Sequence, residues 1–120
     1  MTTTLNDPLR TMTAALPANP VYLEVAIGAR DALGLETFFA HSPDDAKLIA
    51  NLTEKVGYLR HRWCDVRVMV RISQRRFAGG EFLNHLVTVD KTVDHADAHI
   101  YTVAAAVDEA WAVFCASGSF

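Results

Sequence analysis

Positively charged side chains crowd one part of this 120-residue chain. Residues 55–76 hold seven of the eleven Lys and Arg residues and a single acid, so this segment carries a charge of +6. The rest of the chain has four basic and thirteen acidic residues, a charge of −9, and the net charge is −3. Because like charges repel one another, such a cluster indicates an anionic partner, either outside the protein or among its own acidic elements.

The chemistry that this segment favours is anion binding. The planar guanidinium group of Arg matches phosphate and carboxylate groups. Tyr58, Trp63 and Phe77 lie among the cations, as aromatic residues do on nucleic-acid-binding surfaces. We therefore predict a binding protein for nucleic acid or an acidic protein surface; the alternative is a structural role, in which the arginines meet the protein's own acids or a dimer contact. The predicted anion-binding residues are Arg60, Arg62, Arg67, Arg71, Arg75 and Arg76.

Histidines offer a second chemistry. His95 and His99 have the spacing that places two imidazoles on one stripe of a helix, but Asp97 would lie on another side. A catalytic metal site usually has three protein ligands, so the sequence predicts no metal and no cofactor. The alternative function is a small homodimeric enzyme with a histidine-containing small-molecule pocket, which could use His61, His85 or His95.

The chain has no sequence motif for a catalytic nucleophile. Its sequence therefore favours a non-catalytic protein, with an enzyme as the alternative. Cys64 lies among cations, which favour the thiolate and make it the better candidate for a reactive thiol. Cys115 follows Phe114 and is interpreted as a small core residue. We expect both thiols to be reduced in a cytoplasmic protein.

The overall composition is typical of one folded domain over residues 1–120, with residues 1–19 partly flexible. Apolar residues make up 51% of the chain, enough for a core and for a homodimer that buries leftover apolar surface. The N-terminal residues do not read as a signal peptide, and no apolar run is long enough to predict a membrane span.

Several elements are expected before the basic segment. Asp7-Pro8 could start a short helix that reaches about Leu16. Residues 21–27 alternate between apolar and other residues as a strand does, although a helix capped by Asn19-Pro20 is also open. Residues 30–40 are predicted to be helical. Ser42 and Pro43 predict the start of a helix over 43–57, with Gly57 at its end.

The basic segment decides the fold class. Val66, Val68, Val70 and Ile72 alternate with polar or longer residues, which predicts a half-buried strand over 65–74. A second strand over 82–90 would follow Gly79-Gly80 and form a hairpin with a long Arg-bearing loop. The alternative is that the preceding helix continues, because several apolar residues also share one helical arc.

A long helix over 91–116 completes the predicted fold. Its apolar residues recur at helical spacing, and they include Trp111 and Phe114. We predict an α+β fold in which the hairpin 65–74/82–90, with 21–27 as a possible third strand, packs under helices 43–57 and 91–116. The alternative is a mainly α-helical bundle.

Overall fold

The computed structural model describes residues 20–117, except for the side chains of Arg76 and Ala78. Its elements follow the order β1 (Val21–Ala29), β2 (Glu36–Ala40), α2 (Ala46–His61), β3 (Val66–Ala78), β4 (Glu81–Val93), a 3-10 turn (His95–Asp97) and α3 (Ile100–Ser117). The predicted α+β fold is confirmed, and the chain is not a helical bundle. The short helix predicted at 8–16 and the flexibility predicted for 1–19 lie outside the described residues.

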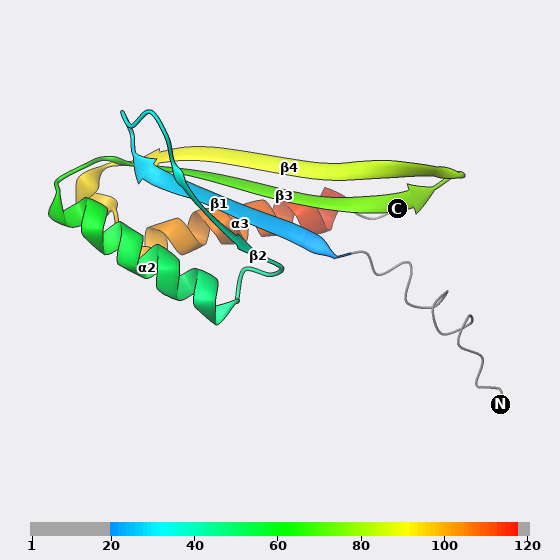
Figure 1. Cartoon of the computed structure of the whole chain (residues 1–120), viewed down its shortest axis with the longest axis horizontal. Coiled ribbons are helices and arrows are strands. Elements are labelled where there is room, and N and C mark those ends of the chain that lie inside the picture. Colours follow the sequence, from blue (N-terminus) through cyan, green and yellow to red (C-terminus); the bar gives the residue numbers. More distant parts are fainter. Residues whose placement is uncertain (1–19, 118–120) are drawn as a thin grey trace.

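The four strands form one antiparallel sheet in the order β2-β1-β3-β4, and both helices pack on the same face of it (Figure 1). β1 pairs with β3 as far as Gln74, so the far part of the β3–β4 hairpin extends beyond β1. Gly79 and Gly80 turn the hairpin with φ values of 63° and 82°, the left-handed conformation that a two-residue turn requires. The long loop predicted here is wrong, because Arg75 and Arg76 belong to the strand.

The strand prediction for 65–74 is confirmed by β3. Val66, Val68, Val70 and Ile72 are completely buried against the helices, and the residues between them face the other way. The extended helix that the sequence left open fails because it would direct Val68 and Ile72 away from the apolar arc. Period-two burial of β-branched residues requires a strand.

The prediction for the first strand is correct, and the prediction for the second strand is wrong. Residues 21–27 are a strand, as alternation predicted, and β1 is the second strand of the sheet. The helix predicted over 30–40 is wrong, because Glu36–Ala40 forms the edge strand β2. Within β2, Phe38 packs on the core while Phe39 points to solvent. Two adjacent aromatic residues fit one helical side as readily as opposite faces of a strand, so the local sequence does not separate the two.

Helix α2 begins and ends later than predicted. Asp45, and not Ser42, is its N-cap: the carboxylate accepts from the backbone N–H groups of Lys47 and Leu48 at 2.9 and 3.1 Å. Gly57 is an exposed residue inside the helix. The helix ends where the Trp63 N–H donates to the Arg60 carbonyl at 3.0 Å, with Trp63 at a φ of 57°.

Helix α3 begins at Ile100, so the predicted start at 91 is wrong: residues 91–93 finish β4. Phe114 is buried, whereas Trp111 only packs against the edge of the core and Cys115 is exposed, contrary to its interpretation as a core residue. By its length and composition alone, α3 is long and apolar enough to cross a membrane, as the core helix of a soluble protein can also be. The core lies between this helix, α2 and the sheet.

Candidate functional site

The face of the sheet opposite the helices is uncovered by any other described element. Strand alternation assigns to it every second residue of each strand, the ones that lie between the buried residues. Several of these side chains are large and exposed. We call the following set the open-face platform: Tyr22, Phe39, Arg71, Arg75, Phe77 and Phe82.

Two arginines of the predicted site belong to this platform. Arg71 is exposed and, within the described part of the chain, makes no hydrogen bond or ion pair. Its neighbour on β1 is Glu24, which lies directly opposite it in the register. The Arg75 guanidinium carbon lies 4.3 Å from the centroid of the Phe82 ring, a cation–π contact that holds the charge over the exposed face.

A third arginine shares the open face but is already paired. Arg67 binds both carboxylate oxygens of Asp90, with distances of 3.1 Å from Nε and 2.6 Å from Nη2. The hydrogen bond and the charge of Arg67 lower the pKa of Asp90 below its ordinary value. This fork is therefore engaged with the protein's own acid, as the structural alternative expected, and it is less available to a partner.

The remaining arginines of the predicted site lie elsewhere. Arg60 and Arg62 belong to the end of α2, before β3 begins, and the Arg62 guanidinium donates to the Tyr58 hydroxyl at 3.1 Å. Arg75 is eight residues beyond Arg67 on β3, which separates them by about 26 Å at the rise of a strand. The side chain of Arg76 is outside the described part. The basic segment is thus continuous in sequence but divided in space.

All four aromatic residues of the platform lie outside residues 55–76, although Phe77 follows directly after them. Tyr22 faces Ser73 across the β1–β3 pair, so it lies diagonally between Arg71 and Arg75. Phe39 is 71% exposed, and the Phe77 and Phe82 rings meet edge to face with centroids 5.1 Å apart. Sequence reasoning missed Tyr22 and Phe39, although the alternation of residues 21–27 already assigned Tyr22 to the face opposite the core.

A hollow of about 370 Å³ adjoins the platform where β1 and β2 approach the start of α2. Tyr22, Phe39 and His41 contribute to its lining. The His41 ring lies 5.6 Å from the Tyr22 ring, and its Nδ1 is hydrogen-bonded to the Val21 carbonyl at 2.8 Å. This bond orients the imidazole beside the tyrosine, so one of the aromatic walls of the hollow is held by a hydrogen bond.

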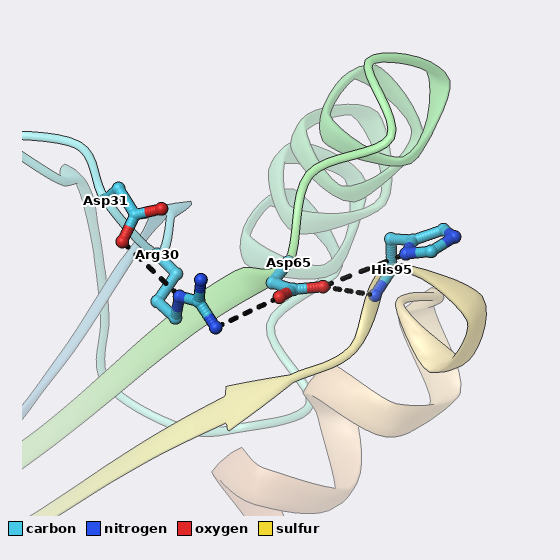
Figure 2. Close-up of polar contacts among 4 residues, drawn as sticks. All are labelled: Arg30, Asp31, Asp65 and His95. Carbon is cyan, nitrogen blue, oxygen red and sulfur yellow. Dashed lines mark hydrogen bonds and ion pairs between the residues drawn. The ribbon is translucent and has the colours of Figure 1, made fainter.

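Four charged or titratable residues form a separate cluster at the opposite end of the sheet (Figure 2). Arg30 lies between two carboxylates, 3.4 Å from Asp31 and 3.2 Å from Asp65. Hydrogen bonding and attraction by Asp31, with further attraction by Asp65, raise the pKa of Arg30. Asp65 also accepts from the His95 backbone N–H at 3.1 Å. These contacts tie the β1–β2 loop, the start of β3 and the 3-10 turn together, which is a structural role.

A second hollow, of about 550 Å³, lies at this end and is lined by Arg30, Asp31, Trp63, Cys64 and Asp65 among others. Cys64 is partly buried, and its thiol contacts the Arg62 carbonyl at 3.7 Å. The Trp63 ring lies 5.3 Å from the His95 ring. Both carboxylates in the lining already bind Arg30, so the polar groups of this hollow are engaged with one another.

The histidines do not meet at one site. His95 and His99 lie before α3 rather than on it, so the shared helical stripe expected from the sequence is wrong. His85 faces Phe114 of α3, eight residues along β4 from Val93, or about 26 Å. Among residues 20–117, no group of three His, Cys, Asp or Glu side chains could hold a metal ion.

The chain matches no family model, no curated protein and no solved structure.

Proposed function

We propose that this protein is a non-catalytic binding protein that holds single-stranded nucleic acid on its open-face platform. The observation that carries the proposal is the combination of exposed aromatic rings with arginines on a sheet face that no described element covers. Bases of a single strand stack on aromatic side chains at any sequence, while guanidinium groups meet the phosphates. Both chemistries occur here within one surface.

The positions of the side chains support a strand lying across the sheet. Tyr22 lies diagonally between Arg71 and Arg75, so a base stacked on its ring would have its phosphates within reach of the two guanidinium groups. Phe39 and the adjacent hollow extend the stacking surface to one side, and Phe82 extends it toward the hairpin turn. An acidic protein surface would use the arginines but leave the rings without a stacking partner.

The charge distribution supports an oriented complex. The chain outside residues 55–76 has a charge of −9, which repels nucleic acid from most of the surface. On the open face, Glu24 and Asp90 offset part of the positive charge, and Asp90 is neutralised by Arg67. Binding therefore depends on a small number of phosphate contacts together with stacking, so we expect a modest dependence on salt.

The test compares two variants that lose the same charge. Arg71→Gln/Arg75→Gln removes the platform cations, and Arg60→Gln/Arg62→Gln removes two cations from the end of α2. Fluorescence anisotropy with a labelled single strand of about 12 nucleotides measures both, across a range of salt. We expect the platform variant to bind at least about tenfold more weakly and the α2 variant to bind within about threefold of the parent protein.

Tyr22→Ala and Phe39→Ala separate stacking from charge: each should weaken binding by about 1–3 kcal/mol while the parent's dependence on salt is retained. Equal losses in the two arginine variants would contradict the platform, since they would show a response to total charge. Absence of oligonucleotide binding at low salt would also contradict the proposal. Binding of polyglutamate in that case would identify an acidic protein as the kind of partner.

A further inference from the structure

The outer edge of β4 is the longest edge of the sheet. The strand order leaves β4 with β3 as its single neighbour in the described chain, and it runs for 13 residues, compared with 5 in the other edge strand β2. A long edge presents backbone N–H and C=O groups that readily pair with another strand. β4 contains no proline, and no other described strand covers it.

The flank of α3 beside this edge is also uncovered and mostly apolar. Only 28% of the residues of α3 are buried within one chain, although the helix is apolar overall. The ion pair between Lys91 of β4 and Glu109 identifies the flank of α3 that lies toward the edge. Helical spacing places three small or apolar exposed residues near Glu109 on this flank, namely Ala105, Val113 and Ala116.

We infer that a second copy of this chain pairs its β4 antiparallel to β4, with a twofold axis at Leu86, and that the two α3 helices pack beneath the joint. The two four-stranded sheets then form one eight-stranded sheet. The occupant of the edge is the chain itself because β4 is complementary to its own copy: one strand offers Glu81 to Lys91 and Lys91 to Glu81, above the same apolar flank of α3.

Charge selects this register. With the axis at Leu86, Glu81 lies opposite Lys91 of the second copy, which would then lie between Glu81 and its own partner Glu109, and this arrangement occurs twice. Leu86 then faces its own copy on the open face, and Leu83 faces Val89 on the helix side. An axis at Asp90 or at Lys91 would place like charges opposite each other, and an axis at Val87 would place Leu83 opposite Lys91. The axis must pass through a residue, and not between two residues, for both open faces to lie on the same side of the joined sheet.

The helices also fit this arrangement. α3 contacts both β3 and β4, so it lies beneath the two strands nearest this edge. Joining two β4 strands therefore brings the two α3 helices side by side beneath the joint. Helices pack at interaxial distances of about 8–10 Å, and small residues such as Ala105 and Ala116 permit the closer part of this range.

This inference is independent of the proposed nucleic-acid binding, although it would join two open-face platforms on one continuous sheet. Its test is a cysteine placed on the axis. Directly opposite residues in an antiparallel pair have Cα atoms about 4.5–5.5 Å apart, within the range for a disulfide. In a full-length chain carrying Cys64→Ser and Cys115→Ser, Leu86→Cys should cross-link most chains into a covalent dimer under mild oxidation.

Two matched cysteines control for position. Thr88→Cys lies on the same strand and face, but its copy would be four residues away, or about 13 Å. Ser73→Cys lies on the open face of β3, at least about 14 Å from its copy across three strand spacings. Both should remain uncross-linked under the same conditions. Cross-linking at Ser73→Cys, or equal cross-linking at Leu86→Cys and Thr88→Cys, would overturn the edge pairing.

Light scattering of the unmodified protein should give twice the 13.2-kDa mass of one chain. Glu81→Lys places a cation opposite Lys91 of the second copy at both ends of the joint and should weaken dimerisation by about three- to tenfold at low salt. Glu54→Lys, at an exposed position of α2, makes the same charge change and should have no effect. A monomer in the unmodified protein, or equal weakening by both substitutions, would overturn the inference.

Discussion

The two faces of the sheet carry different kinds of residue along the same strands. On the helix side of β3, Val68 and Val70 are completely buried, whereas Arg67 and Arg71, one residue away from each, lie on the open face. On the helix side, each side chain must match the volume left by α2 and α3, because protein interiors are close-packed. On the open face, a side chain meets water and few neighbours, so its type is set much less by stability.

This difference separates fold from function within one element. Large aromatic residues on an exposed face contribute little to the core, and Phe39 and Phe82 both lie there. In the proposed function, these rings are the surface on which the bases of a single strand stack. The arginines of the open face also differ in whether they already bind an acid. Arg67 is held by Asp90, while Arg71 has no hydrogen bond or ion pair among the described residues.

The largest expected effect tests the covered face. Phe114→Ala should lower the free energy of unfolding by about 3–5 kcal/mol, because the ring is buried against the sheet and its removal leaves a cavity. Phe39→Ala removes the same atoms from the open face and should cost less than about 1 kcal/mol. Urea unfolding of both variants measures the contrast. A similar loss in the two proteins would show that the open face is covered in solution.

A smaller effect of opposite sign is expected at the end of α2. Trp63 has a φ of 57°, a conformation that costs a residue with a side chain roughly 1–2 kcal/mol and costs glycine little. The tryptophan is 77% exposed, so little packing is lost with it. Trp63→Gly should therefore stabilise the protein by about 1 kcal/mol in thermal unfolding, and Trp63→Ala should not. If the glycine variant is less stable than the alanine variant, the left-handed backbone at Trp63 does not carry the expected cost.

The smallest effect concerns the ion pair on the open face. The pKa of Asp90 is lowered from 3.8 by Arg67, so the ionised carboxylate stabilises the folded state above that pH. This contribution is lost as the pH falls through the lower pKa of the folded protein. Carboxyl-carbon NMR should show Asp90 titrating below 3.8, and Arg67→Gln should raise its pKa toward that value. An unchanged titration would show that the pair does not persist in solution.

The sequence predicted elements correctly where its pattern favoured one interpretation over the alternative. Alternation of β-branched residues identified β3, and Gly79-Gly80 identified the turn that follows it. Prediction failed at β2, because Phe38 and Phe39 fit a helix or a strand equally well until β1 is present to pair with them. It also failed at the start of α3, since residues 91–93 are required to complete the pairing with β3.

The candidate site was predicted in part for a related reason. The sequence located the cations but not their grouping: the strand directs Arg71 and Arg75 to one face, while Arg60 and Arg62 remain on α2. Two of the four aromatic residues of the platform, Tyr22 and Phe39, come from β1 and β2, which are 30 or more residues away from the platform arginines. No local pattern brings Tyr22 beside Ser73, because that contact arises only when β1 pairs with β3.

The sequence by itself favoured the α+β class over a helical bundle and indicated the buried face of β3 and the turn of the hairpin, because each follows from the period of apolar residues or from the backbone freedom of glycine. The tertiary structure alone decided which arginines share a surface, which of them an acid neutralises, and which strand lies at the long edge. These properties depend on contacts between residues far apart in the chain. The net charge and the composition are sums over the sequence. Which residues lie opposite one another depends instead on the register of the strands in the sheet.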